Sequence, residues 1–564
     1  MNRRVGDPFR RYSDRFDRPL EPAREELRGG ADPTTVARRR GLPAAAVRGP
    51  ASFFADLAAP PAARHVRVCT AAACFAATAG GRHVGAVTAA LGTEDGGLSA
   101  DGSTSLQHVR CLGYCYAAPA ALDGDDPCAG DQLAEQLAGT RARHDPEIPV
   151  VCDSPVPVVT AGLMGAEEPW AVWPRTVTTH DPAWVLGQVE RSGLRGRGGA
   201  GFPTAAKWRA ALEHDAPRTV VVNGDEGDPG SFVDRLLMES DPHRLLEGLA
   251  LASFAVGAEE AVVFVRSEYP RARRRLEEAV REAYDAGHLG PAVHGTDLRL
   301  DVRVAEGAGS YVSGEETALL NGLEGLRGVV RPRPPYPTEL GLHGRPTVVN
   351  NVETLAAVPW VVRHGGDAYA RMGTPEQNGT VVVSLSERFA RPGAYEVQIG
   401  VPVRHVVDVL GGGLKDGARL RALQVGGPLG GFLGPDDLEL PLSDAGLAPV
   451  GVALGHGGMV AFDEHVTGEG VLRNLWTFVA AESCGLCSPC RVGSRRGLDL
   501  AGAAADPAAA AADPAGAAAD PAGAAARAQV LESMGTASLC AFGRRVPAAV
   551  RSLVRVYGLE GWSW

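Results

Sequence analysis

Eight of the ten cysteines in this chain fall into two sets of four whose spacing suits iron–sulfur chemistry. The C-terminal set reads Cys484-Gly-Leu-Cys487-Ser-Pro-Cys490, with Cys540 as its distant fourth member. Thiolates separated by two residues along a short loop can turn toward one cube of iron and sulfide, and zinc sites rarely chain three cysteines in this way. The set therefore predicts a [4Fe–4S] centre.

The N-terminal set combines a four-residue gap, from Cys69 to Cys74, with a three-residue gap, from Cys111 to Cys115. Two such pairs suit two irons that are each held by two thiolates, which predicts a [2Fe–2S] centre. A structural zinc site is the alternative, because four thiols in a small Ala-rich segment could also hold zinc. A disulfide framework is disfavoured, since no hydrophobic signal segment opens the chain. The two remaining cysteines are interpreted as small buried or incidental thiols: Cys128 and Cys152.

The length and charge of the chain narrow its possible functions. Its 564 residues predict about three to five domains. A net charge of −11 gives no reason to expect a nucleic-acid partner. No uncharged apolar run is long enough to span a bilayer, so we expect no direct membrane insertion. Reduced cysteines without an export signal predict a cytoplasmic protein, which could lie at the inner face of the membrane only through partners.

Changes in residue composition and pattern along the sequence indicate where domains begin and end. A strand at residues 65–68 leads into Cys69, and a second strand precedes the Cys111 loop, which predicts a small α/β domain. Residues 129–174 are rich in proline, glycine and charge, and we interpret them as a linker. Between Cys490 and Cys540 an Asp-Pro repeat recurs at residues 506, 513 and 520. Its prolines break helices and no apolar seam exists, so an exposed low-complexity insertion is expected.

A glycine-rich segment opens the central region. Residues Gly196 to Gly201 match G-x-G-x-x-G literally, but a Rossmann turn needs a preceding strand. The residues before it, Trp184 to Ser192, have helical spacing instead. The Rossmann interpretation therefore fails. What remains is a run of small residues whose backbone N–H groups can approach a phosphate, with Lys207 positioned to add a charge.

Three further polar motifs follow this loop. They are Val220-Val-Val-Asn-Gly-Asp-Glu-Gly-Asp-Pro-Gly230, then Gly307-Ala-Gly-Ser-Tyr-Val-Ser-Gly-Glu-Glu-Thr317, and then Val348-Val-Asn-Asn-Val-Glu353. Taken singly, the acids could serve a helix dipole and the asparagines could cap a turn. Taken together, they supply phosphate donors, ribose-binding acids and amide groups for the edge of an isoalloxazine ring.

These motifs resemble those of a known family, the NADH-oxidising flavoprotein subunit of respiratory complex I. The family includes the diaphorase subunits of NAD-reducing hydrogenases and of NAD-dependent formate dehydrogenases. The segments that carry the resemblance are RGRGGAGFPTAAKW, VVNGDEGDPGSFVDR, GAGSYVSGEETALLNGLEG, TVVNNVETLA and ESCGLCSPCRVGS. The N-terminal segments LPAAAVRGPASFF, HVRVC and CLGYC are similar to the family's separate thioredoxin-like [2Fe–2S] subunit, here fused.

The resemblance implies a multidomain α/β fold. It comprises a thioredoxin-like [2Fe–2S] domain, a non-Rossmann FMN- and NADH-binding α/β domain, a β-grasp-like domain and a C-terminal helical bundle with the [4Fe–4S] centre. The expected boundaries are residues 1–23 for an N-terminal tail, 24–128, the linker at 129–174, 175–366, 367–464, and 465–564 with the insertion at about 501–526.

The resemblance also implies the site residues, which are carried over motif by motif. FMN contacts would be Gly196, Gly198, Lys207, Asn223, Asp225, Glu226, Gly314, Glu315, Asn350 and Asn351. NADH contacts would be Gly199, Phe202, Lys207, Asp228, Tyr311, Glu316, Arg333 and Tyr336. Family members often carry Glu, Lys and Phe where Asp228, Arg333 and Tyr336 stand. A further pocket aromatic is replaced by Ala210. We therefore expect weaker binding of the adenine ring.

The implied function is that of a diaphorase that passes electrons between NAD(H) and the clusters through FMN, which converts hydride transfer into single-electron steps. No residue need act as a catalytic acid or base, because hydride transfer demands only that the nicotinamide be held against the flavin. Segments CRVGSRRGLDL and SLCAFGRRVPAAVRSL favour a formate dehydrogenase as the partner complex, with complex I or a hydrogenase as alternatives. An electron-transfer or assembly scaffold without NADH activity is the alternative of another class.

Overall fold

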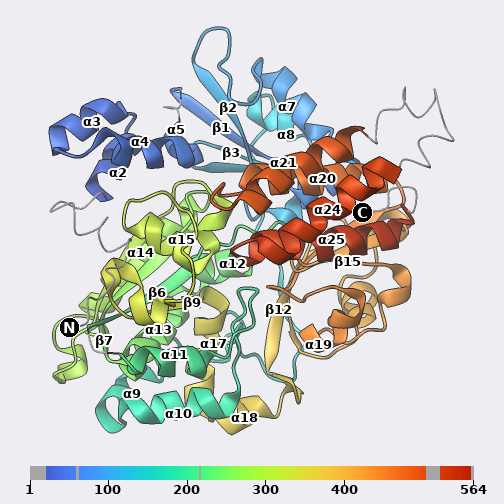
Figure 1. The fold of residues 1–564 in the computed structure, drawn as a ribbon. Coiled ribbons are helices and arrows are strands. Elements are labelled where there is room, and N and C mark those ends of the chain that lie inside the picture. The colour runs from blue at the N-terminus through green and yellow to red at the C-terminus, as the bar shows by residue number, and fades with distance from the viewer. Residues whose placement is uncertain (1–20, 59–61, 215–216, 504–520, 560–564) are drawn as a thin grey trace, which may run out of the picture.

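The computed structural model describes residues 21–58, 62–214, 217–503 and 521–559. Figure 1 shows a small sheet at the top, a parallel sheet with its helices at the lower left, a mixed sheet and a bundle of helices. The expected N-terminal tail, residues 1–23, lies outside the described residues except for its last three, which begin a helix. No helix in the described ranges is long and apolar enough to cross a bilayer.

The N-terminal domain is built on a four-stranded sheet of order β2-β1-β3-β4. Its strands are β1 (Arg64–Cys69), β2 (Thr104–Val109), β3 (Ala120–Asp123) and β4 (Asp126–Ala129). β1 and β2 are parallel, with Cys69 opposite Val109, so the loops that follow both strands leave the same edge of the sheet. The strand predicted at residues 65–68 is confirmed. Its flanking helices are α6 (Ala72–Ala77), α7 (His83–Leu91) and α8 (Leu133–Leu137), so the domain continues beyond residue 128.

Four short helices precede this sheet and pack elsewhere, on the central domain. They are α2 (Glu21–Arg28), α3 (Pro33–Arg40), α4 (Ala44–Phe53) and α5 (Ala55–Ala58). Their apolar side chains share a core with Ala308. Arg28 donates a hydrogen bond of 2.5 Å to the carbonyl of Gly307 and pairs with Glu306 at 3.0 Å. The helices therefore support the loop that begins at Gly307.

The central domain holds an all-parallel sheet of order β8-β7-β6-β9. Its strands are β6 (Arg218–Gly224), β7 (Ala258–Val265), β8 (Asp301–Glu306) and β9 (Thr347–Asn351). Val220, Val221 and Val222 are fully buried because helices cover both faces. The helices used below are α10 (Pro182–Ser192), α11 (Thr204–Leu212), α12 (Val233–Ser240), α15 (Glu316–Leu323) and α17 (Val352–His364).

A six-stranded mixed sheet of order β15-β14-β16-β12-β13-β5 follows. Its strands are β12 (Thr380–Leu385), β13 (Gly393–Gln398), β14 (Leu420–Val425), β15 (Phe432–Leu433), β16 (Gly458–Asp463) and β5 (Val150–Cys152). Strand β5 comes from residues 129–174, which we expected to be a linker, and it pairs in parallel with β13. Part of that segment is therefore integrated in the fold.

Two buried carboxylates explain why this segment is ordered. Glu396 on β13 is fully buried and accepts hydrogen bonds from the backbone N–H groups of residues 158–160 at 2.9–3.0 Å. Glu247 accepts three more from residues 170–173 at 2.8–3.1 Å. A segment without its own hydrophobic period is thus held by charge-assisted hydrogen bonds to distant residues.

We expect Glu396→Ala to destabilise the protein, because three buried backbone N–H groups lose their acceptor. Leaving buried donors unpaired predicts a loss of about 3 kcal/mol in the free energy of unfolding. Urea denaturation followed by circular dichroism measures this loss. Glu439→Ala is the matched control, since this glutamate is exposed and pairs with Arg404 on the surface. Equal midpoints for the two variants would contradict the role of Glu396.

The described part of the C-terminal domain forms a bundle of helices (Figure 1). They are α20 (Gly468–Glu482), α21 (Ser488–Ala503), α24 (Pro521–Ala537) and α25 (Ala541–Tyr557). The bundle is close-packed: a Cβ at Gly497 would lie 2.2 Å from Trp476. Of the insertion expected at about 501–526, residues 504–520 lie outside the described residues. Residues 501–503 end α21, and α24 begins at Pro521, as suits a proline in a first helical turn.

Candidate functional site

The polar motifs of the central domain meet at the carboxyl edge of its parallel sheet. Asn223 lies near the end of β6, and Asn350 and Asn351 end β9. Arg266 directly follows β7, and Tyr311 follows β8. The chain proceeds from β6 to β7 on one side, whereas β9 lies on the other side of β6. This reversal of strand order marks the place where open α/β sheets bind ligands.

The glycine-rich loop connects α10 to α11 and lies beside the end of β9. The predicted helix before it is confirmed. The Gly196 N–H donates to the carbonyl of Phe202 at 2.9 Å and closes the loop. A Cβ at Gly198 would lie 2.9 Å from the Asn351 Cβ, so a larger residue would push the two segments apart. Gly199 has a φ of +105° and faces open space, so backbone groups here are accessible to a ligand.

Two cations and two acids form a partly exposed cluster next to this loop. Lys207 Nζ donates to the Val349 carbonyl at 2.9 Å and lies 3.3 Å from Glu316. Arg333 pairs with the same Glu316 at 2.6 Å and with Glu315 at 3.3 Å. The Glu315 carboxylate also accepts two backbone N–H bonds at the start of α15. Glu316 is therefore held between two positive side chains.

Two of the predicted nucleotide contacts are aromatic rings left in solvent. Phe202 is 52% exposed and Tyr336 is 56% exposed. Large apolar rings that no core covers suit stacking against a planar ligand. Their contact with NADH stays a prediction.

Several predicted flavin contacts already have protein partners. Asn223 Nδ2 donates to the Gly314 carbonyl at 2.7 Å, and Asn350 Oδ1 accepts from the Trp208 indole at 2.9 Å. The Glu226 carboxylate is buried and accepts the first N–H groups of α12 at 3.0 and 3.1 Å. These side chains fix the loops of the site. Their direct contact with a flavin stays a prediction.

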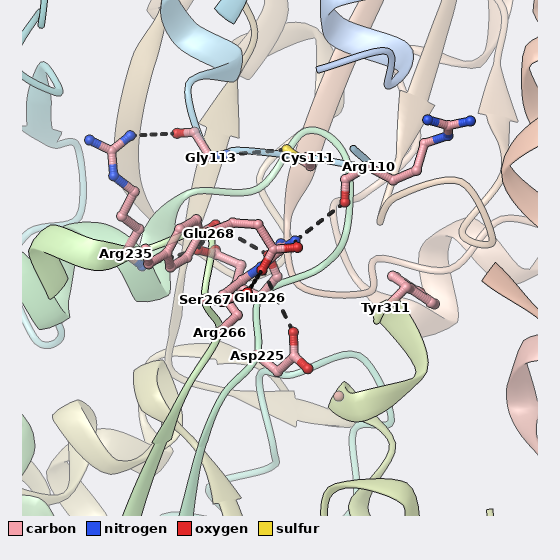
Figure 2. Close-up of polar contacts among 12 residues, drawn as sticks. Arg110, Cys111, Gly113, Asp225, Glu226, Arg235, Arg266, Ser267, Glu268 and Tyr311 are labelled. Atoms are coloured by element: carbon pink, nitrogen blue, oxygen red, sulfur yellow. Dashed lines mark hydrogen bonds and ion pairs between the residues drawn. The ribbon is translucent and has the colours of Figure 1, made fainter. Parts of the chain in front are cut away.

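A buried arginine joins the loop after β6 to the N-terminal cysteine domain (Figure 2). Arg266 forms a bidentate pair with Glu268 at 2.8 and 3.0 Å, and its Nη1 donates to the Glu226 carbonyl at 2.5 Å. Its Nη2 reaches the Arg110 carbonyl, directly before Cys111, at 3.3 Å. Burial raises the pKa of the neighbouring Asp225 well above its ordinary value, although Arg266 at 3.9 Å opposes this shift.

Asp228 lies between two side chains from different segments. The Tyr311 hydroxyl donates to its Oδ1 at 2.6 Å, and His456 Nε2 lies 2.7 Å from its Oδ2. The Tyr311 backbone N–H donates to Glu482 of α20 at 3.0 Å, and its ring packs on Phe478. The predicted nucleotide site is thus connected to both the mixed sheet and the helical bundle.

The four N-terminal cysteines lie together, buried at the border with the central domain. Cys111 Sγ and Cys115 Sγ are 3.3 Å apart, and Cys69 interacts with Cys111 and Cys74. The Gly230 N–H, in the loop between β6 and α12, donates to Cys115 Sγ at 3.3 Å. Hydrogen bonds to cluster sulfurs are one way in which proteins set a reduction potential.

The C-terminal cysteines gather where α21 and α25 begin. Cys490 is buried, and this burial together with the neighbouring thiols raises its pKa to about 12. Cys540 immediately precedes α25, and burial, with Glu315 nearby, raises its pKa to about 11. No three His, Cys, Asp or Glu side chains in the described ranges converge as a site for one metal ion. The ligand assignment of both sets stays a prediction that rests on their shared locations.

Comparison with known families gives a match to three of the domains. Residues 189–360 match the family described as the Nuo51 FMN-binding domain. Residues 32–138 match the thioredoxin-like [2Fe-2S] ferredoxin family, and residues 470–560 match the NADH-ubiquinone oxidoreductase-F iron-sulfur binding region. The matches follow the domain order that the sequence motifs predicted.

Similar proteins extend this result. The NADP-reducing hydrogenase subunit HndC of Solidesulfovibrio fructosivorans is 43% identical over 321 residues, which cover 57% of this chain and 65% of that subunit. An NADH-quinone oxidoreductase subunit of Streptomyces coelicolor is 44% identical over 317 residues, which cover 56% of this chain and 70% of the relative. The chain belongs to this family of FMN-containing NADH dehydrogenase subunits.

A solved structure matches almost the whole chain. It is that of an NAD+-reducing [NiFe]-hydrogenase in the H2-reduced state, with a TM-score of 0.83 and 32% identity over 96% of this chain and 91% of that chain. The arrangement of domains in this chain is therefore shared with that hydrogenase chain. The expected fold class and the expected cofactors, FMN, NAD(H), [2Fe–2S] and [4Fe–4S], are confirmed at the level of the family.

The residues of this chain fit FMN as the bound flavin. The loop at Gly198 approaches β9 more closely than any side chain would allow, and Gly199 leaves accessible backbone beside it. Lys207 adds an ammonium group on a side chain that is 22% accessible. Backbone N–H groups with one cation are the donor set that an anionic phosphate requires.

The sequence motifs did not reveal three residues that the structure places at the site. Arg266, His456 and Glu482 each contact a predicted site residue from another segment or domain. Arg266 and His456 are single charged side chains without a surrounding pattern, so no local signal could have identified them. Glu482 is the first residue of the segment ESCGLCSPCRVGS, but the sequence did not assign it a contact.

Proposed function

We propose that this chain is the NAD(H)-linked diaphorase subunit of a larger redox complex, in which electrons pass between NAD(H) and the clusters through FMN. One observation carries the proposal: both cysteine sets lie against the loops of the flavin site. Gly230 of the β6–α12 loop donates to Cys115, and Glu315 at the start of α15 lies near Cys540.

Each group of residues has a role in this proposal. The loop from Gly196 to Gly201 and Lys207 bind phosphate, and Asp228 and Glu316 line the nucleotide site. FMN, when bound, accepts a hydride and releases electrons singly. The protein holds the nicotinamide in place and excludes water, and it supplies no acid or base to the hydride itself.

The partner complex has two candidates. The C-terminal segments around Cys490 and Cys540 favour a formate dehydrogenase. The match along nearly the full length of an NAD+-reducing [NiFe]-hydrogenase chain supports a hydrogenase as the second candidate. Purifying the complex through a tag on this chain and testing whether formate or H2 reduces NAD+ separates the two candidates.

Bleaching of the flavin tests the proposed activity directly. Purified under anaerobic conditions, the protein should show a visible flavin band that NADH bleaches without any partner subunit. The alternative is an electron-transfer or assembly scaffold without NADH activity, which the loss of a pocket aromatic at Ala210 favours. This alternative predicts that the clusters are present but that NADH leaves the flavin oxidised.

We expect NADH to be preferred over NADPH. The carboxylates of Asp228, Glu315 and Glu316 would repel a 2′-phosphate in a partly desolvated pocket, which predicts a ratio of kcat/KM of at least about tenfold. Ferricyanide reduction measures both values. Glu316→Gln should narrow the ratio because it also frees Lys207 and Arg333 for the phosphate, whereas the exposed Glu339→Gln should not. Equal values in the unmodified protein would refute the assignment of these acids to the ribose site.

A further inference from the structure

A buried histidine contacts the first pair of N-terminal cysteines from behind. His83 is the first residue of α7 and is 7% exposed. Its Nε2 lies 2.8 Å from the carbonyl oxygen of Cys69. Because a carbonyl oxygen can only accept a hydrogen bond, Nε2 carries a ring proton and donates it. The imidazole is therefore bonded to the backbone of the cysteine that ends β1.

The other ring nitrogen of His83 faces a threonine that contacts the second cysteine of the pair. The Thr78 oxygen Oγ1 lies 2.8 Å from His83 Nδ1, and the Thr78 hydroxyl donates to the carbonyl oxygen of Cys74 at 2.8 Å. Thr78 directly follows α6, on which Cys74 lies. One imidazole thus connects the backbone of Cys69, on a strand, with that of Cys74, on a helix.

The chain turns sharply after α6 to bring His83 to this position. Ala79, Gly80 and Gly81 have consecutive φ values of +45°, +99° and +85°. Glycine adopts such values readily, whereas alanine adopts them under strain and only where the surrounding structure holds it. Strain of this kind clusters at functional sites. The turn places the start of α7, and with it the imidazole, against the end of β1.

The two cysteine pairs of this domain are held in different ways. The loop of the second pair is held by other domains, since the Gly230 and Glu387 N–H groups donate to the Cys115 Sγ and carbonyl at 3.3 and 2.8 Å. The residues between the cysteines of the first pair are one threonine and three alanines, and alanine side chains form no hydrogen bonds. His83 contacts this pair from within the domain, and its hydrogen bonds reach both cysteines.

We propose that His83 is a positioning residue of the [2Fe–2S] site, which fixes Cys69 and Cys74 relative to each other. The four N-terminal cysteines fit such a site, because they lie together and each is at most 2% exposed. The inference rests on the part of the proposed function that takes these cysteines as ligands of the centre. Residues that orient metal ligands through hydrogen bonds affect metal affinity by about 10- to 100-fold. Without the imidazole the centre should therefore be lost more readily.

His83→Leu tests the proposal, because it keeps a side chain of similar volume and removes both ring nitrogens. The full chain, purified anaerobically, is incubated with an iron chelator and then reduced for spectroscopy. The [2Fe–2S] paramagnetic signal should decay at least about tenfold faster than in the unmodified protein. The [4Fe–4S] signal of the same sample should decay at its usual rate. His83→Gln should restore most of the lifetime, since its amide can still donate to the Cys69 carbonyl.

His65→Leu is the matched control. His65 lies on β1 of the same domain, and its ring nitrogens bond the side chains of Ser105 and Gln107 at 2.8 and 3.0 Å. Its substitution should leave the decay unchanged. An unchanged decay in His83→Leu, or an equal acceleration in the two leucine variants, refutes the proposal.

The g values of the reduced centre separate positioning of the ligands from support of the domain. They should shift in His83→Leu, because two thiolates are no longer held in their orientation, and they should stay unchanged in His65→Leu. Faster decay with unchanged g values would show that His83 only stabilises the domain, which contradicts the proposal.

Should His83→Leu fail to fold, the comparison passes to His83→Gln and His83→Asn. Their amides differ in reach by one methylene group, and only the glutamine reaches the Cys69 carbonyl. Equal decay rates in these two variants refute the proposal. An unmodified protein without a [2Fe–2S] signal would refute the ligand assignment and the proposal with it, whereas failure of NADH to bleach the flavin would refute only the proposed activity.

Discussion

Replacing Cys487 and Cys490 with serine is expected to abolish electron transfer to the partner subunits while NADH still bleaches the flavin. Both cysteines belong to the set that gathers where α21 and α25 begin, and Cys490 is buried. Their loss removes two ligands of one cluster. The expected fall in transfer exceeds about 100-fold, the upper range for changes that touch only the surroundings of a metal site.

The structure explains why the flavin should remain reducible in this variant. The bundle contacts the flavin domain through Tyr311, whose ring packs on Phe478 of α20 and Phe542 of α25, and these aromatic contacts do not involve the cysteines. The NADH-dependent bleaching and the [4Fe–4S] paramagnetic signal are measured on the same preparation. Cys152→Ser is the control, because this cysteine lies on β5, outside both sets. A retained signal in the double variant would contradict the ligand assignment.

Local sequence patterns predicted those elements whose cause is local. The alternation at residues 65–68 and the helical spacing of Trp184–Ser192 each appear in the structure as predicted. The placement of Cys69 and Cys111 follows as well, because Cys69 ends β1 and Cys111 comes shortly after the parallel neighbouring strand β2. These features depend on the period of side-chain burial, which a sequence displays directly.

The features that were missed depend on partners far away in the sequence. Residues 150–152 carry no strong strand signal of their own and become a strand because β13 and Glu396 lie beside them. In the same way, Ala-rich residues 521–526 form the first turns of α24 because Pro521 suits a first helical turn and the later turns pack on α21 and α25. Composition alone described both segments as irregular.

The same distinction applies to the site. The family motifs supplied Asp228 and Tyr311, but not the hydrogen bond between them or the histidine on the other side of the carboxylate. They supplied Glu226, but not its use as a cap for α12. A motif identifies which residue types are present, whereas their orientation and charge state depend on the loops of other domains.

Substitution of Cys69 and Cys74 by serine is expected to separate the two clusters functionally. The [2Fe–2S] paramagnetic signal should disappear, whereas NADH oxidation by an acceptor that takes electrons directly from the flavin should continue. Cys69 ends β1 and Cys74 lies on α6, so neither lies on the Cys111–Cys115 loop that contacts the flavin domain. That contact depends on Cys115, through the Gly230 N–H, and on the Gly113 carbonyl, to which Arg235 donates at 2.9 Å.

Cys128→Ser is the matched control for this variant, because Cys128 is buried in the same domain but outside the set, among the side chains of another core. It should keep both the signal and the activity. Zinc at this site would give no paramagnetic signal to lose, so the experiment also decides between zinc and iron. If the Cys69 and Cys74 substitutions stop flavin reduction in a protein that still binds FMN, the [2Fe–2S] centre is required for hydride entry, and the expected separation of the two clusters is wrong.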